Sequence, residues 1–375
     1  MILPTRPELA HEKPYGAPQL DVPVCLNVNE NPYDPSPELV KQIAAEVAEA
    51  AEHLNRYPDR DFTALREDLS DYLAEESGVR LPISQLWAAN GSNEVMFHIL
   101  QAFAGPGRII ATFQPSYSMY PEYARDVYSV WVTGRRNADF SLNFAEVQRV
   151  LSEENPSVIL LASPNNPTGT ALPVDQLRRV LDLAIQHGPE LDVGDEKTEK
   201  TAALVVVDEA YAEFRRDGVP SALELLAEYP NLVVARTMSK AFGAAGLRLG
   251  YMAASAEVVD QIRVIRLPYH LSAITQAAAR GALAHRAELS KQVDQIRADR
   301  DQLAQSLRGL GWEVADSDAN FVMFGHFDDR HQVWQGLLDR GVLIREVGPD
   351  GWLRVSVGTP EENAAFLTAL QEVTK

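Results

Sequence analysis

The segment ALVVVDEAYAEF, residues 203–214, joins an uninterrupted apolar run to an acid. The run from Leu204 to Val207 is rich in β-branched valine, which is typical of a strand buried on both faces of a sheet. Asp208 follows this strand directly, at the carboxyl end where open α/β sheets bind ligands. An acid that ends a strand is also a common turn or helix-capping residue, so Asp208 by itself does not identify a site.

Similar short apolar runs recur along the chain, and helical patterns separate them. RIIATF (108–113), SVIL (157–160) and NLVVART (231–237) have the composition of strands. NEVMFHILQAF (93–103) and VDQLRRVLDLAIQ (174–186) place their apolar residues at helical spacing. Buried strands that alternate with helices predict an α/β fold with a mainly parallel sheet.

Changes in composition and hydrophobic pattern divide the chain into three parts. Residues 1–35 are rich in Pro and Asn, and we expect an irregular N-terminal arm. Residues 36–270 carry the alternating pattern of a large α/β domain. Residues 271–375 read as one long helix up to Gly309–Gly311, followed by strands and a helix, which predicts a smaller α+β domain. The charged insertion ELDVGDEKTEKTA (190–202) is expected to be a mobile loop.

Composition and charge exclude several classes of protein. The 375 residues carry a formal net charge of -19, which argues against nucleic acid and anionic membranes as general partners. The single cysteine, Cys25, cannot form an intramolecular disulfide, and the chain begins without the apolar run of a signal peptide. We therefore expect a cytoplasmic protein. The histidines are scattered without a zinc-ligand spacing, which predicts no metal site.

Three other polar features stand at the ends of predicted strands or at helix starts. Asn166, in the turn SPNNPTGT (163–170), places an amide at the end of a strand. Ser92 and Asn93 begin a helix that they can cap, and the free amides of its first turn suit a phosphate. Ser239 and Lys240 follow the strand 231–237, with Arg248 nearby. Each feature alone is common in turns and helix caps.

Together these features describe one ligand. A lysine that desolvation and cationic neighbours keep neutral can form an imine with an aldehyde. An arginine and a helix start can hold a phosphate, an acid can pair with a ring nitrogen, and an amide can bind a ring oxygen. A lysine imine and an acid at a pyridinium nitrogen are how proteins bind pyridoxal phosphate. Neither a P-loop nor a dinucleotide-binding glycine pattern is present.

With these features, the chain resembles the fold-type-I pyridoxal-phosphate aminotransferases, and among them the histidinol-phosphate aminotransferases of actinobacterial type. The resemblance covers nearly the whole length, and the insertion at 190–202 departs from it between motifs. Its motifs are PYGAP (14–18), LNVNENPY (26–33), NRYPDRD (55–61), WAANGSNE (87–94), PSYSMYP (115–121), SPNNPTG (163–169), VDEAYAEF (207–214), RTMSKAFGAAGLRLGY (236–251), RLPYHLS (266–272), SDANFVMFG (317–325), LIREVG (343–348) and LRVSVGT (353–359).

The resemblance assigns roles to particular residues. It implies that Lys240 forms the imine and shuttles protons, that Asp208 pairs with the pyridinium nitrogen, and that Tyr117 stacks on the ring. The ring oxygen would be held by Asn166 and Tyr211. The phosphate would be held by Ser92, Asn93, Ser239 and Arg248, and by Tyr57 from the second subunit of a homodimer. Substrate would be bound by Tyr15, Asn29, Tyr57, Arg345 and Arg354. Arg354 would bind the α-carboxylate of glutamate, and one or both arginines the phosphate of histidinol phosphate.

The implied reaction is transamination of imidazole-acetol phosphate with glutamate, which yields histidinol phosphate and 2-oxoglutarate in histidine biosynthesis. An aromatic-amino-acid (phenylalanine) aminotransferase and a threonine-phosphate decarboxylase remain alternatives, because the substrate pocket decides between them. A regulatory protein built on a degenerate aminotransferase domain is disfavoured, since every catalytic position is intact and the charge is acidic.

Overall fold

The computed structural model describes residues 3–9, 12–194 and 197–375 of the chain. At its centre lies a seven-stranded sheet with the strand order β2-β10-β9-β8-β5-β3-β4. The strands are β2 (Leu86–Ala89), β3 (Ile109–Gln114), β4 (Val130–Arg135), β5 (Val158–Ala162), β8 (Leu204–Asp208), β9 (Leu232–Thr237) and β10 (Gly250–Ala254). Each strand of the run β4-β3-β5-β8-β9 is parallel to its neighbours in that run. The predicted mainly parallel α/β fold is confirmed.

The strand β10 is the exception to the parallel arrangement. It pairs antiparallel with both β9 and β2. Its first residue, Gly250, lies against the start of helix α3 (Gly91–Phe103), where a Cβ atom would stand 2.2 Å from the backbone nitrogen of Ser92. Only glycine permits this approach. β10 therefore brings the start of α3 close to the segment that follows β9.

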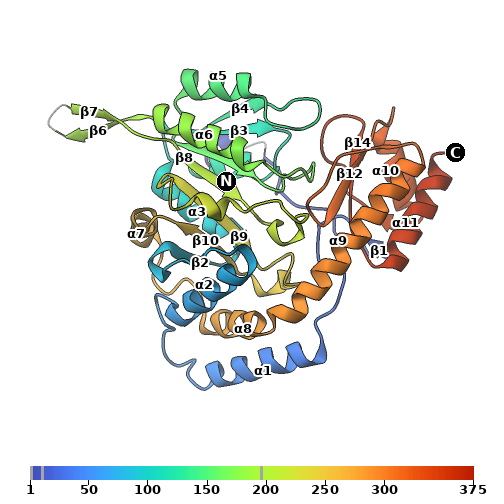
Figure 1. Cartoon of the computed structure of the whole chain (residues 1–375), viewed down its shortest axis with the longest axis horizontal. Coiled ribbons are helices and arrows are strands. Elements are labelled where there is room, and N and C mark those ends of the chain that lie inside the picture. Colours follow the sequence, from blue (N-terminus) through green and yellow to red (C-terminus); the bar gives the residue numbers. More distant parts are fainter. Residues whose placement is uncertain (1–2, 10–11, 195–196) are drawn as a thin grey trace.

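Helices cover the central sheet and connect it to the rest of the molecule (Figure 1). Besides α3 they are α1 (Pro37–Ala51), α2 (Thr63–Ser77), α4 (Tyr120–Asp126), α5 (Phe144–Glu154), α6 (Val174–Gln186), α7 (Ala256–Ile265), α8 (Ala273–Ala284), α9 (Arg286–Gly309), α10 (Arg330–Leu338) and α11 (Pro360–Val373). In α1, Ser36 caps the first turn by accepting from the amide of Leu39, and Pro37 supplies a preset backbone angle. None of the helices in the described ranges is long and apolar enough to cross a membrane.

The long helix α9 leads from α8 to a second, smaller sheet (Figure 1). This sheet has the order β11-β12-β14, with bounds Glu313–Val314, Phe321–Gly325 and Trp352–Ser356. The single long helix expected from residue 271 is wrong, because the chain forms two helices that meet at His285, the C-cap of α8. The arm also contains an ordered strand, since β1 (Val24–Cys25) pairs in parallel with β13 (Val342–Leu343).

The charged insertion at 190–202, expected to be a mobile loop, contains regular strand structure. It forms an antiparallel ribbon of β6 (Glu190–Gly194) and β7 (Lys197–Lys200) that projects away from the central sheet (Figure 1). Residues 195–196 lie outside the described part of the chain. The side chains of β7 are exposed, so the ribbon is held by its own backbone pairing rather than by burial.

Candidate functional site

Segments from the whole length of the chain meet in one cavity of ≈ 280 Å³. It lies where β5, β8 and β9 end, and the arm and the loop before β14 close it. The cavity brings together all the predicted site residues except Tyr57. They are Tyr15, Asn29, Ser92, Asn93, Tyr117, Asn166, Asp208, Tyr211, Ser239, Lys240, Arg248, Arg345 and Arg354.

Lys240 lies just beyond β9 with its amine inside this cavity. Its Nζ donates a hydrogen bond to the carbonyl oxygen of Val28 over 2.8 Å. Burial, together with the positive charge of Arg354, lowers the pKa of Lys240 to about 8, and the charge of Glu30 opposes the shift. A substantial share of this amine is therefore neutral near physiological pH, as a nucleophile or a proton carrier requires.

Asp208 ends β8 with its carboxyl group buried. Tyr120 donates to its Oδ2 over 3.2 Å, and the amide of Ala210 donates to its Oδ1 over 3.2 Å. Burial raises the pKa of Asp208 to about 6, although these donors oppose the rise. A cationic partner would stabilise the ionised form. Tyr120 was not predicted, and its only signal in the sequence is its place three residues after Tyr117.

Two amides converge on the hydroxyl group of Tyr211. Asn29 Nδ2 donates to it over 3.0 Å, and Asn166 Nδ2 donates over 3.2 Å. Because both bonds use the oxygen as acceptor, the hydroxyl proton remains free to donate to a ligand in the cavity. Asn29 is itself oriented by Ser356, whose Oγ donates to Asn29 Oδ1 over 2.9 Å. This arrangement suits an anionic ring oxygen.

The start of α3 and the segment after β9 form a cup for an anion. Arg248 has a left-handed backbone, with φ 58°, and its Nη1 lies 3.4 Å from Ser239 Oγ. A Cβ atom on Gly91 would stand 2.6 Å from Arg248 Nη2, so glycine makes room for the guanidinium group. The expected capping by Ser92 or Asn93 is wrong, because α3 begins at Gly91 and both residues lie in its first turn. Their amides and the guanidinium group can together hold a phosphate.

Two arginines of the C-terminal part line the opposite side of the cavity. Arg354, on β14, is buried and donates to Asn166 Oδ1 over 2.6 Å and to the carbonyl oxygen of Asn27 over 2.9 Å. Burial lowers the pKa of Arg354 to about 10, and its Nε has no hydrogen-bond partner in the described ranges. Arg345 lies beside it through a backbone bridge. A buried guanidinium group with an unused donor favours an anionic ligand.

Three tyrosines were also predicted to belong to the site. Tyr117 lines the cavity, and Tyr15 reaches it from the arm, with its hydroxyl 2.6 Å from Ser118 Oγ. Tyr57 does not line the cavity. It is 79% exposed and stacks on Tyr269, with ring centroids 4.5 Å apart. The single chain therefore does not test the predicted role of Tyr57, which requires a second subunit.

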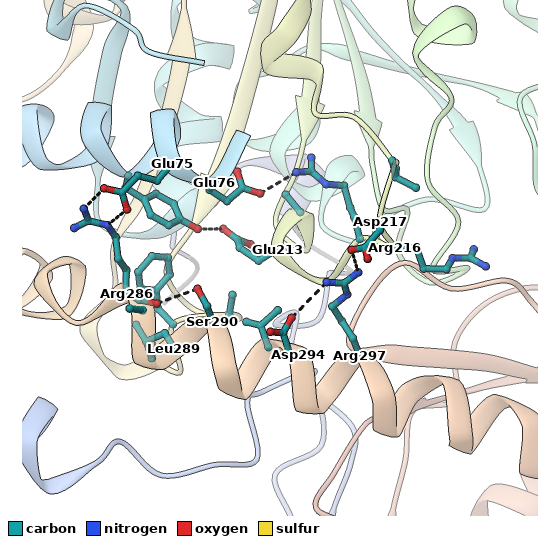
Figure 2. Close-up of a pocket in the computed structure, with 18 of the residues that line it drawn as sticks. Glu75, Glu76, Glu213, Arg216, Asp217, Arg286, Leu289, Ser290, Asp294 and Arg297 are labelled. Atoms are coloured by element: carbon teal, nitrogen blue, oxygen red, sulfur yellow. Dashed lines mark hydrogen bonds and ion pairs between the residues drawn. The ribbon is translucent and has the colours of Figure 1, made fainter. Parts of the chain in front are cut away.

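A second and larger cavity, of ≈ 810 Å³, lies between α2 and α9. None of the predicted site residues lines it. Figure 2 shows that several of its charged side chains pair with one another, as in Glu75–Arg286 and Asp217–Arg297. Its wall includes Ala241, the neighbour of Lys240. Despite its size it lacks the convergent groups of the smaller cavity, which we take as the functional site.

The smaller cavity fits pyridoxal phosphate group by group. Lys240 offers an amine, Asp208 a carboxylate for the ring nitrogen, Tyr211 a donor for the ring oxygen, and Arg248 a cup for the phosphate. The missing Cβ of Gly91 leaves space for that cup. Arg354 remains for a substrate anion.

Comparisons with known proteins agree with this geometry. The family model "Aminotransferase class I and II" matches residues 22–370. Histidinol-phosphate aminotransferase 3 of Burkholderia lata is 56% identical over 99% of this chain and 96% of its own length. The histidinol-phosphate aminotransferase of Bifidobacterium longum is 52% identical over 100% of this chain and 97% of its own.

A solved structure matches the fold as well. Histidinol-phosphate aminotransferase from Sinorhizobium meliloti, in complex with pyridoxal-5'-phosphate, has a TM-score of 0.79 and 25% sequence identity. The match covers 94% of this chain and 91% of that one. With relatives more than half identical over nearly their full length, the chain belongs to the aminotransferase class I and II family, among the histidinol-phosphate aminotransferases.

Proposed function

We propose that this enzyme binds pyridoxal phosphate and transfers the amino group of glutamate to imidazole-acetol phosphate, in the histidine pathway. The observation that carries the proposal is the placement of Lys240 and the buried Arg354 in one cavity. An amine with a lowered pKa stands there beside a guanidinium group with an unused donor. Relatives that are 56% and 52% identical carry the name of this activity.

The cofactor would be held at both ends and at its ring. Lys240 would bind its aldehyde carbon, and Arg248, Ser239 and the first turn of α3 its phosphate. Asp208 would keep the ring nitrogen protonated, and the resulting charge pair would remove the cost of its burial. Pyridoxal phosphate supplies an aldehyde that accepts the amino group and a ring that takes up the electron pair of the broken C–H bond. Tyr117 would cover one face of that ring.

Lys240 would also carry the proton between the α-carbon of the substrate and the aldehyde carbon of the cofactor. Its neutral amine accepts a proton, and the ammonium form is stabilised by the charge of Glu30 and destabilised by that of Arg354. Since the Nζ already contacts Val28, the side chain has a resting position when it is not bound to the cofactor. Tyr211 would stabilise negative charge on the ring oxygen by donating its free proton.

Arg354 and Arg345 would bind the substrate anions. Arg354 would take the α-carboxylate of glutamate in one half-reaction, and one or both arginines the phosphate of the second substrate in the other. Asn29 and Tyr15 would contact the substrate from the arm, where the bond from Tyr15 to Ser118 closes that side of the cavity.

The protein would act as a cytoplasmic homodimer with a large domain (36–270) and a small domain (271–375). Tyr57 of each chain would reach the cofactor phosphate of the other. Exposed apolar side chains support this arrangement, because Tyr57 stacks on Tyr269, and Leu54, Val264 and Leu267 are exposed as well. The solution mass tests it, and a fully active species with the mass of one chain would contradict it.

The reaction is tested by substrate preference and by removal of the lysine. Purified enzyme with glutamate should convert imidazole-acetol phosphate in preference to phenylpyruvate, and it should release no CO2 from threonine phosphate. Preference for phenylpyruvate would instead identify an aromatic aminotransferase, and CO2 release a decarboxylase. Lys240→Ala should abolish turnover and the visible absorbance of the lysine-bound cofactor. Full activity in that variant would exclude the proposed mechanism.

A further inference from the structure

Glu30 occupies a rigid position at the edge of the site. The carbonyl oxygens of Asn29 and Glu30 both accept from Asn320 Nδ2, over 3.0 Å and 3.3 Å. On one side, the Asn29 side chain is fixed by Tyr211 and Ser356. On the other, Asn31 Nδ2 donates to the carbonyl oxygen of Ala241 over 3.3 Å. The backbone at Glu30 is therefore fixed from both directions.

The side chain of Glu30 contrasts with this fixed backbone. It lines the cavity and is exposed, and within the described ranges its carboxylate makes neither a hydrogen bond nor an ion pair. The other carboxylate of the cavity, Asp208, is buried and already accepts two hydrogen bonds. The cationic groups of the cavity are Lys240, Arg248, Arg345 and Arg354. Among the described residues that line the cavity, Glu30 is thus the one carboxylate without a hydrogen bond or ion pair, and it is accessible to a ligand.

One group of the proposed substrate, its imidazole ring, has no binding partner among the residues assigned so far. Its phosphate suits the arginines and its amino group goes to the cofactor, while the imidazole ring, with an N–H donor and a cationic form near neutral pH, still needs an acceptor. We propose that Glu30 binds this ring, accepts its N–H and favours the imidazolium form. This inference rests on the proposed function and makes Glu30 a determinant of substrate specificity.

The same contact would disfavour the aromatic alternatives. A phenyl ring offers no N–H, so its binding would desolvate the Glu30 carboxylate without replacing the lost hydrogen bonds to water. Sites built around a substrate N–H reject analogues that lack it much more strongly than apolar pockets reject small changes in size. Glu30 would therefore both select imidazole compounds and exclude phenyl compounds.

A second role for Glu30 has to be separated from this one. Its negative charge raises the pKa of Lys240, so a substitution could also change the chemistry of the lysine. That effect would act on every amino donor alike. Recognition of the imidazole ring would instead change the ratio of two substrates, and this ratio is the quantity to measure.

The experiment compares the holoenzyme with Glu30→Gln, Glu30→Asp and a control, Asp34→Asn. Asp34 is exposed, lies four residues away, does not line the cavity, and loses the same charge on substitution. The rate of the first half-reaction, followed by cofactor absorbance, gives kcat/KM for histidinol phosphate and for phenylalanine. For Glu30→Gln we expect a loss of about 10- to 100-fold with histidinol phosphate, as for a hydrogen bond to a charged group. With phenylalanine the value should stay level or rise.

Glu30→Asp should recover part of the preference, and Asp34→Asn should retain all of it. An equal loss with both substrates would show that Glu30 acts by changing the pKa of Lys240, and it would overturn the inference. Unchanged kinetics in Glu30→Gln would overturn it as well. Wild-type enzyme that fails to act on histidinol phosphate while it transaminates phenylalanine would overturn the proposed function itself. That result appears in the wild type before any variant is measured, so the two failures are distinguishable.

Discussion

Tyr120 donates a hydrogen bond from its hydroxyl group to Oδ2 of Asp208 over 3.2 Å, in a fully buried environment. This bond stabilises the ionised carboxylate against the burial that raises its pKa. In Tyr120→Phe the carboxylate should hold a pyridinium ring less firmly. We expect the dissociation constant of pyridoxal phosphate to rise about 10-fold, within the range for a hydrogen bond to a charged group. Absorbance titration of the cofactor-free protein measures it.

The matched control for this variant is Tyr229→Phe. Tyr229 donates to Asp182 over 2.9 Å and does not line the cavity. The Tyr229→Phe variant therefore loses the same kind of hydrogen bond elsewhere in the molecule, and its affinity for the cofactor should stay at the wild-type level. Equal affinity in the two variants would show that Tyr120 does not position Asp208 for the cofactor.

Asp208 should lower the stability of the protein when no cofactor is bound. Its pKa is raised from 3.8 to about 6, so the folded state binds this proton more tightly than the unfolded chain does. The resulting stability is complete below pH 3.8 and is lost as the pH rises through 6. At pH 7 the loss reaches about 3 kcal/mol, and Asp208→Asn, which stays neutral, should recover up to that amount.

Urea unfolding of cofactor-free proteins at pH 4 and pH 8 tests this prediction. The gain of Asp208→Asn over wild type should be present at pH 8 and nearly absent at pH 4. The same comparison with Asp34→Asn corrects for the smaller net negative charge, because the chain carries a formal charge of -19. A gain that is independent of pH would contradict the assigned pKa. Turnover in Asp208→Asn should fall sharply, which separates stability from function.

The sequence predicted the central sheet because its strands are read from local composition. Runs such as Leu204–Val207 are apolar and β-branched, and they become β8 and its neighbours. Asp208 and Lys240 could be placed together because both follow predicted parallel strands, and the carboxyl ends of parallel strands lie at the same edge of a sheet. The sequence does not predict the junction at His285 because both α8 and α9 have helical composition, and what separates them is the non-helical backbone of His285, with φ -104° and ψ 17°.

Other features of the site depend on contacts between distant segments. Tyr120 and Asp208 are 88 residues apart, and Asn320 and Asn29 are 291 apart, so no local pattern pairs them. The sequence predicts a mobile loop at 190–202 because the segment is polar and its charged residues are poor strand formers. The hairpin nevertheless forms, as its backbone groups pair with each other without needing a buried face.

Gly91 should be intolerant of any side chain. Its φ is +83°, and an added Cβ would stand 2.6 Å from Arg248 Nη2. Gly91→Ala should displace the guanidinium group from the phosphate cup and weaken cofactor binding by about 10-fold or more, as for a lost charged hydrogen bond. Gly246→Ala is the control, since Gly246 has open space around its Cβ position and lies two residues before Arg248. Equal cofactor affinity in the two variants would place the phosphate elsewhere.

Arg354 should be required for its shape as well as for its charge. Its Nη1 and Nη2 are fixed by Asn166 and Asn27, which leaves the Nε edge to a ligand. Lysine keeps the charge but has no planar fork, so Arg354→Lys should raise KM for glutamate on the order of 100-fold. The visible absorbance of the bound cofactor should persist. Arg345→Lys should leave KM for glutamate within about 3-fold, because Arg345 is only partly buried and solvent-screened charge contacts contribute little. If Arg345→Lys raised KM for glutamate and Arg354→Lys did not, the carboxylate would be bound by Arg345 instead.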